Sequence, residues 1–200
     1  MAIIVKHAVL EKQCRILNLW GNQFTAKSLP LLCKILNNNR TLRELDLSHN
    51  HFGDEGVQII CNVLSFNHSR LKELDLSGNE ITDRGAAYLS SMLRRNTRLK
   101  RLILNRNDIT NDGFLRLANA LVRDNENLIQ LKLEGNPFIT RTGVINVLNL
   151  LRRNQILEDI YVKDCSIVDR DFSLLERMSF TTGFDIIVSN RTYIFPNPYL

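Results

Sequence analysis

A nine-residue frame, Leu-x-x-Leu-x-Leu-x-x-Asn, recurs along most of this 200-residue chain and constrains its fold more than any other feature. It reads Leu-Arg-Glu-Leu-Asp-Leu-Ser-His-Asn over residues 42–50 and Leu-Lys-Glu-Leu-Asp-Leu-Ser-Gly-Asn over residues 71–79. The successive copies open at Cys14, Leu42, Leu71, Leu99, Leu128 and Leu157. Their spacing of 28, 29, 28, 29 and 29 residues predicts a chain in which each unit packs mainly on its neighbours and all units together form one extended surface.

Each unit is predicted to contain one short strand and one helix. Within the frame, inward residues such as Leu45 alternate with outward ones such as Asp46, as they do in a strand. Further along, apolar residues recur at spacings of three and four over residues 85–93, and Thr82 or Asp83 can cap the helix that this pattern predicts. Parallel strands are expected near residues 16–18, 44–46, 73–75, 101–103, 130–132 and 159–161.

The geometry of stacked units predicts curvature. Neighbouring strands lie about 4.8 Å apart, whereas packed helices need about 10 Å, so the helix side must splay and the strand side becomes concave. A strand–helix–strand crossover of this kind is right-handed in nearly all cases. Glycine recurs where the helices start, either because two elements approach closely there or because the backbone adopts an unusual dihedral. These glycines are Gly56, Gly85, Gly113 and Gly143.

The 28- and 29-residue units resemble the ribonuclease-inhibitor-like subfamily of leucine-rich repeats, which includes the arrays of NOD-like receptors, Ran GTPase-activating proteins and tropomodulins. The frame followed by Ile-Thr-Asp-x-Gly-Ala, a helix and an Asn-x-x ending carries the resemblance, most clearly over residues 71–98. It implies an α/β fold, a right-handed leucine-rich-repeat solenoid or horseshoe segment with parallel strands on the concave face and helices on the convex face. The subfamily serves many activities, so the resemblance implies a binding surface without fixing a partner.

The repeats are expected to occupy residues 14–180. Residues 1–13 suit an amphipathic helix that covers the first unit. Residues 181–200 suit a C-terminal cap and tail, with a pair of strands over residues 184–188 and 192–195.

The last frame position is predicted to form an asparagine ladder, because a side-chain amide both donates and accepts hydrogen bonds and can satisfy the backbone of adjacent turns. Its members are Asn22, Asn50, Asn79, Asn107 and Asn136, with Cys165 in the same place in the last unit.

No catalytic, metal-binding or cofactor-binding motif emerges from the sequence, and we expect a non-enzymatic chain without cofactors. His49 and His51 flank a ladder asparagine, so their rings should diverge, and neither has a carboxylate or cysteine at ligand spacing. The four cysteines form no Cys-x-x-Cys pair and suit a reducing compartment. With no stretch approaching the roughly 18 apolar residues of a membrane span, we expect a cytoplasmic monomer that does not associate with membranes.

The concave face is the expected site for a partner protein. Asp46 and Asp75 belong to a repeated Leu-Asp-Leu-Ser string, which we interpret as scaffold. The informative positions depart from it with aromatic, apolar or cationic groups, the types enriched in interfaces. Acidic Glu44 and Glu73 give way to Arg101 in the same column, so the face changes from acidic to basic along its length. The candidate partner-binding residues are Trp20, Lys100, Arg101, Ile103, Arg106 and Tyr161.

Other functions remain open. Family resemblance allows a GTPase-activating or actin-capping regulator, and an isolated array could be a microbial effector that imitates host repeats. A net charge of +5 and a pI of 9.2 raise nucleic-acid binding. Acidic residues interrupt the uniform basic strip that such binding requires; they are Glu44, Glu73, Glu134, Glu158, Asp159 and Asp164.

Overall fold

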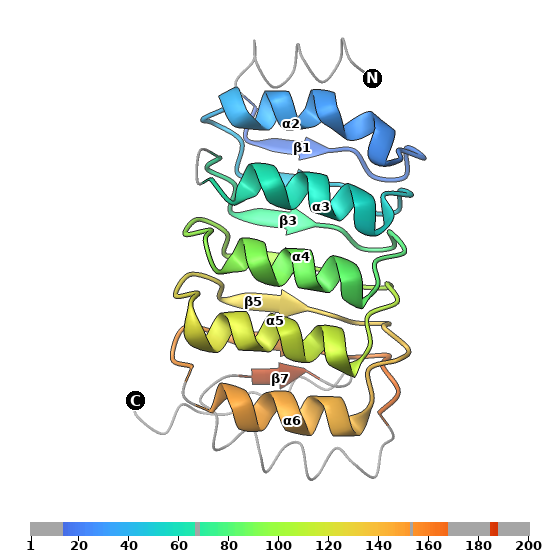
Figure 1. The fold of residues 1–200 in the computed structure, drawn as a ribbon, viewed down its shortest axis with the longest axis vertical. Coiled ribbons are helices and arrows are strands. Elements are labelled where there is room, and N and C mark those ends of the chain that lie inside the picture. The colour runs from blue at the N-terminus through green and yellow to red at the C-terminus, as the bar shows by residue number, and fades with distance from the viewer. Residues whose placement is uncertain (1–13, 67–68, 153, 168–184, 188–200) are drawn as a thin grey trace.

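In the computed structural model, which describes residues 14–66, 69–152, 154–167 and 185–187, strands and helices alternate (Figure 1). The strands are β1 (Ile16–Asn18), β2 (Glu44–Asp46), β3 (Glu73–Asp75), β4 (Arg101–Ile103), β5 (Gln130–Lys132), β6 (Asp159–Tyr161) and β7 (Asp185–Ile187). The helices are the short 3-10 helix η2 (Ala26–Ser28), α2 (Leu29–Asn38), α3 (Gly53–Leu64), α4 (Asp83–Leu93), α5 (Asn111–Arg123) and α6 (Arg141–Leu151). The first six strands coincide with the predicted triplets.

The strands form one open sheet in chain order, each parallel to the next. Equivalent frame positions stand opposite one another, as in the pair Leu45 and Leu74 and the pair Leu74 and Leu102. Figure 1 shows the helices stacked along the long axis on one side of the strands. The expected α/β solenoid is therefore confirmed, and its concave side is called the strand face and its convex side the helix face below.

The core lies between the two faces. The inward leucines of the central units, including Leu47, Leu76 and Leu104, are fully buried with 0% exposure, which confirms which strand positions point inward. They pack in one cluster with helix residues such as Leu89 and Leu117. Burying each such side chain stabilises the fold by about 1.5–3 kcal/mol.

At the C-terminal end the sheet continues by one strand. Residues of the first strand expected there form β7, which lies parallel to β6 with Ile160 opposite Ile186. Ile186 is buried, so β7 contributes to the same core. The helix expected over residues 1–13 and the strand expected over 192–195 lie outside the described residues.

Close approach explains the glycine where α5 starts. Asp83 at the start of α4 accepts hydrogen bonds from the backbone N–H groups of Thr110 (2.8 Å) and Gly113 (3.0 Å) and from the Thr110 hydroxyl (2.6 Å). A Cβ on Gly113 would lie 2.3 Å from the Asp83 carboxylate. The aspartate of one helix thus caps the next helix, and of the two explanations for glycine at this position, close approach applies.

The last frame position joins adjacent units. Asn107 donates to the carbonyls of Leu76 (3.1 Å) and Leu104 (3.0 Å), and its Oδ1 accepts from the backbone N–H groups of Asn79 (2.9 Å) and Ile81 (3.1 Å). Asn50, two units earlier, makes the corresponding bonds between the first and second units. In the last unit the Cys165 thiol donates to the carbonyl of Leu133 at 3.3 Å.

A second row of asparagines, absent from the predicted set, joins the opposite edge. Asn125 donates to the carbonyl of Leu93 (2.7 Å), and its Oδ1 accepts from the backbone N–H groups of Asn127 (3.0 Å) and Leu128 (2.8 Å). Asn96 and Asn154 make equivalent contacts. The asparagine that recurs in the Asn-x-x ending is the sequence feature from which this second row could have been predicted. Just before the frames that open at Leu99, Leu128 and Leu157, this row fixes the opposite edge to the preceding unit.

Candidate binding surface

A shallow groove of about 670 Å³ crosses the strand face beyond the carboxyl ends of the strands. We call it the strand-end groove. Six consecutive units contribute to its lining, with Trp20 from the first, His49 from the second, Arg106 from the fourth and Lys163 from the sixth. A surface shared by this many units can hold an extended ligand rather than a small molecule.

Trp20 supplies the large apolar side chain of the groove. Its side chain is 59% exposed, and its indole meets the His49 ring edge-on with centroids 5.8 Å apart. Its backbone N–H donates to the Asn18 side chain at 2.9 Å, which fixes the local turn. An exposed tryptophan held in a defined orientation offers apolar area with little further loss of conformational freedom.

Three residues that line the groove sit on left-handed backbone. His49 (φ 53°), Arg106 (φ 52°) and Asp164 (φ 55°) occupy the eighth frame position, which alternates along the chain with glycines such as Gly78. A Cβ on Gly78 would lie 2.9 Å from the His49 ring, so the ring covers the glycine of the next unit. The left-handed conformation disfavours a non-glycine residue by about 1–2 kcal/mol. This pattern was not predicted, although the alternation of glycine and non-glycine residues at the eighth frame position is visible in the sequence.

The N-terminal half of the strand face is acidic. Glu44 and Asp46 on β2 stand beside Glu73 and Asp75 on β3. Burial raises the pKa of the Asp75 carboxyl, and the carboxylates of Asp46 and Glu73 raise it further, whereas hydrogen bonds from Ser77 lower it. On β4, Arg101 forms an ion pair with Glu73. The change of sign along the face is therefore bridged by a contact within the chain.

The six candidate residues divide into three groups. Trp20 and Arg106 both line the strand-end groove. Arg101, Ile103 and Tyr161 lie on the strands themselves. The Tyr161 ring faces the Lys132 ammonium, 4.6 Å from its centroid.

Lys100 precedes β4, and its backbone N–H donates to the carbonyl of Lys72 at 2.8 Å. Burial lowers the pKa of Lys72, and the neighbouring Lys100, Arg98 and Arg43 lower it further. Lys100 thus belongs to a cationic row at the edge of the strand face, apart from the groove that Arg106 lines.

The two histidines diverge as expected. His49 faces Trp20, whereas the His51 Nδ1 lies 2.9 Å from a carboxylate oxygen of Glu80. In the described part of the chain, no group of three or more histidine, cysteine or acidic side chains is placed to hold a metal ion. Within the same residues, no helix has the length and apolar character needed to cross a bilayer.

Comparison with known proteins identifies the repeats. A family model described as "Leucine Rich repeat" matches residues 38–61, 66–90 and 95–118. Ribonuclease inhibitor from Sus scrofa is 30% identical over 151 residues, which is 76% of this chain and 33% of that protein. The chain is a leucine-rich repeat protein. Its repeats are of the ribonuclease-inhibitor-like type that also occurs in NOD-like receptors.

Two further relatives carry the same repeats. Ribonuclease inhibitor from Mus musculus is 41% identical over 66 residues, covering 32% of this chain and 14% of that protein. Human NACHT, LRR and PYD domains-containing protein 12 is 32% identical over 164 residues, covering 81% of this chain and 15% of that protein. The leucine-rich repeat chain therefore spans about a third or less of the length of these relatives.

Among solved structures, Leiomodin-1 Actin-Binding Site 2 superimposes with a TM-score of 0.46 at 18% identity, covering 82% of this chain and 80% of that one.

Proposed function

We propose that this leucine-rich repeat chain is a non-enzymatic protein-binding module that holds a partner protein against its strand face. The strand-end groove carries the proposal, because it presents the exposed Trp20 beside polar and charged groups of both signs. Interfaces concentrate their binding energy on such aromatic anchors, while surrounding polar contacts set orientation. Ribonuclease inhibitor, by its name, acts on another protein, and this supports the same role for the repeats here.

The charges on the strand face define the partner further. Asp46 and Asp75 would meet cationic groups, and Arg106 and Lys163 would meet carboxylates. The partner should therefore carry an apolar pocket or edge that receives Trp20. Basic groups on the partner would face Asp46 and Asp75, and acidic groups would face Arg106 and Lys163. Ile103 and Tyr161 on the strands would extend the contact, with Lys100 and Arg101 at its margin.

We place the module in the cytoplasm as a monomer. The structure contains four free cysteines, Cys14, Cys33, Cys61 and Cys165. Burial raises the pKa of Cys33 to about 11, so this thiol stays protonated at neutral pH. Packing cysteines of this kind suit a reducing compartment.

The test compares two exposed aromatic side chains. After crosslinked partners have been identified by mass spectrometry, the dissociation constant of the purified complex is measured for Trp20→Ser and for Phe138→Ser. Phe138 is 55% exposed and lies outside the groove, so it controls for loss of a surface aromatic group. Loss of the anchor should weaken binding by about tenfold or more, while the control variant should bind like the wild type.

Equal affinity for wild type and Trp20→Ser would contradict the proposal. Nucleic-acid binding is the competing outcome, because phosphate contacts release counterions and make affinity fall steeply with salt. Submicromolar, salt-sensitive binding of a random-sequence DNA duplex, measured by fluorescence anisotropy, would favour that function instead.

A further inference from the structure

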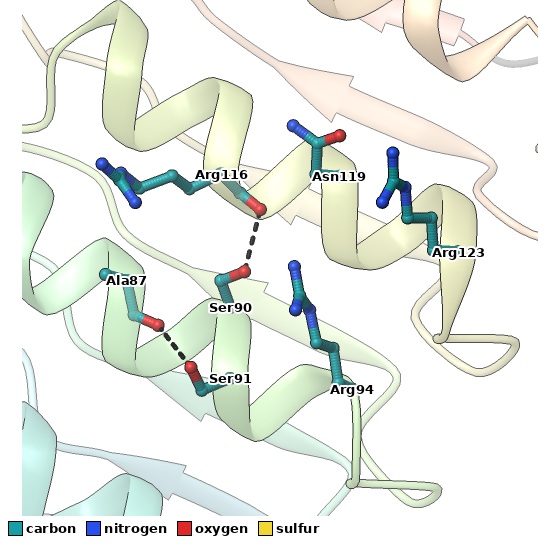
Figure 2. A pocket seen from close by; sticks show the side chains of 7 residues that line it. All are labelled: Ala87, Ser90, Ser91, Arg94, Arg116, Asn119 and Arg123. Carbon is teal, nitrogen blue, oxygen red and sulfur yellow. Dashed lines mark hydrogen bonds between the residues drawn. The ribbon is translucent and has the colours of Figure 1, made fainter.

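The helix face carries a second hollow, of about 330 Å³, between α4 and α5 (Figure 2). On α4 its lining residues are Ala87, Ser90, Ser91 and Arg94, and on α5 they are Arg116, Asn119 and Arg123. Both sets recur at spacings of three, four or seven residues, so each forms a single stripe along its helix. We call this hollow the arginine pocket.

The arginine pocket is hollow because its α4 wall is made of small side chains. The positions of Ala87 and Ser90 hold Gln58 and Cys61 in α3 and Leu115 and Ala118 in α5. In the neighbouring grooves, the longer Gln58 and Leu115 replace Ala87. This unit thus departs from the chain's own repeat at Ala87, whereas the position of Ser90 is small in all three helices.

Three arginines line this hollow. Figure 2 shows Arg94 extending from α4 toward α5, Asn119 and Arg123 projecting from α5, and the Arg116 side chain extending toward the Ala87 end, away from the other two arginines. The Arg94 Nε lies 3.4 Å from an Asp124 carboxylate oxygen, and both of these side chains are largely exposed. Among the ion pairs formed within the described residues, none involves Arg116 or Arg123.

The serine and asparagine side chains of the lining already donate to backbone carbonyls, so the arginines are the main hydrogen-bond donors available to a ligand. The Ser90 hydroxyl donates to the Arg116 carbonyl at 2.9 Å, and the Ser91 hydroxyl donates to the Ala87 carbonyl at 3.0 Å. The Asn119 amide donates one N–H to the Leu115 carbonyl at 2.9 Å, which leaves its second N–H available. No carboxylate belongs to the lining. Its surface therefore favours a compact group of high negative charge with several acceptor oxygens.

We propose that the arginine pocket binds a phosphomonoester. A phosphoryl group carries nearly two negative charges near neutral pH and three terminal oxygens, and guanidinium groups recognise such oxygens with paired, charge-assisted hydrogen bonds. A single carboxylate offers only one charge and two oxygens to three cations. The phosphoryl group can belong to a free small molecule or to a phosphorylated side chain of a partner protein. This binding is separate from the strand face and independent of the function proposed for it.

Isothermal titration calorimetry at about 0.15 M ionic strength tests the pocket with two phosphomonoester probes, glycerol 3-phosphate and a phosphoserine tripeptide. The double variant Arg116→Ala/Arg123→Ala should raise the dissociation constant by about tenfold or more. The matched control, Arg84→Ala/Arg152→Ala, removes the same charge from exposed positions on the helix face outside the pocket and should stay within about twofold of the wild type. Ser91→Leu fills the hollow without removing a charge and should also weaken binding.

Tighter binding of glycerol 3-phosphate indicates a free small-molecule phosphomonoester, tighter binding of the tripeptide indicates a phosphorylated partner, and either supports the site. The proposal is overturned if neither probe binds the wild type, if the control variant weakens binding as much as the double variant, or if Ser91→Leu binds normally. Thermal unfolding followed by circular dichroism verifies that each variant is folded before titration.

Discussion

The strand face and the helix face handle charge differently. On the strand face, charged side chains contact their counterparts in the next unit, as Arg101 does with Glu73 and as Lys132 does with the Tyr161 ring. On the helix face, the described residues give Arg116 and Arg123 no ion pair, and a hollow remains between their helices. The strand face therefore joins an acidic cluster to a cation through one ion pair within the chain, whereas on the helix face Arg94 pairs with Asp124 and the charges of Arg116 and Arg123 border the hollow.

The spacing of the elements accounts for this contrast. Strands about 4.8 Å apart force outward side chains of adjacent units into contact. Opposite charges there form pairs, as Arg101 and Glu73 do, and like charges shift a pKa, as Asp46 and Glu73 do for Asp75. Helices packed about 10 Å apart leave room between side chains, so a run of small residues such as Ala87 and Ser90 opens a space. A residue that breaks the repeat therefore changes the charge or polarity of the strand face, whereas on the helix face it also changes the shape of the surface.

The largest expected effect comes from the hydrophobic core, which lies between the strand face and the helix face. Leu76→Ala should lower the free energy of unfolding by about 2–5 kcal/mol, because it removes a fully buried side chain. Lys72→Ala should change it by less than about 0.5 kcal/mol, since the neighbouring cations already disfavour the charge of Lys72. Urea unfolding of both variants measures the difference. Equal losses would mean that the core does not dominate over the surface of the strand face.

An intermediate effect is expected where the helix face depends on close approach. Gly113→Ala should lower the free energy of unfolding by about 1–3 kcal/mol, because the new Cβ would displace the Asp83 carboxylate that caps α5. An unconstrained helix would instead gain about 1 kcal/mol from this change. A double-mutant cycle with Asp83→Ala should recover part of the loss. A stabilised Gly113→Ala variant would contradict the close-approach explanation.

The smallest effect concerns protonation on the strand face. Burial raises the pKa of Asp75 above its ordinary value of 3.8, so the folded chain holds this proton more tightly than the unfolded chain. The contribution of Asp75 to stability is therefore greatest below pH 3.8 and declines as the pH rises through the raised pKa. An asparagine at this position does not titrate, so its contribution to stability does not decline as the pH rises.

The advantage of Asp75→Asn over the wild type in urea unfolding should accordingly grow between about pH 3.5 and pH 7. The Asn side chain can still accept the hydrogen bonds from Ser77. A difference between the two proteins that is independent of pH would show that burial and the acidic neighbours do not raise the pKa of Asp75 in the folded chain.

Part of the candidate site could be predicted from the sequence. The frame places Trp20 and Arg106 on the outward side of the strands, and the structure brings both to the strand-end groove. The contact of Arg101 with Glu73 follows from their shared column once parallel register is assumed. The arginine pocket was not predictable in this way, because it depends on how the stripes of two helices oppose each other.

The sequence by itself determined the period, the strands and the inward leucines, since these follow from alternation and spacing within each unit. Only the tertiary structure decided which cations share a surface. Arg94 and Arg106 fall within one basic segment, yet the first lines the arginine pocket and the second lines the strand-end groove. The chain turns from helix to strand between them, so neighbours in sequence point to opposite faces, while residues about one repeat apart, such as Glu73 and Arg101, come into contact.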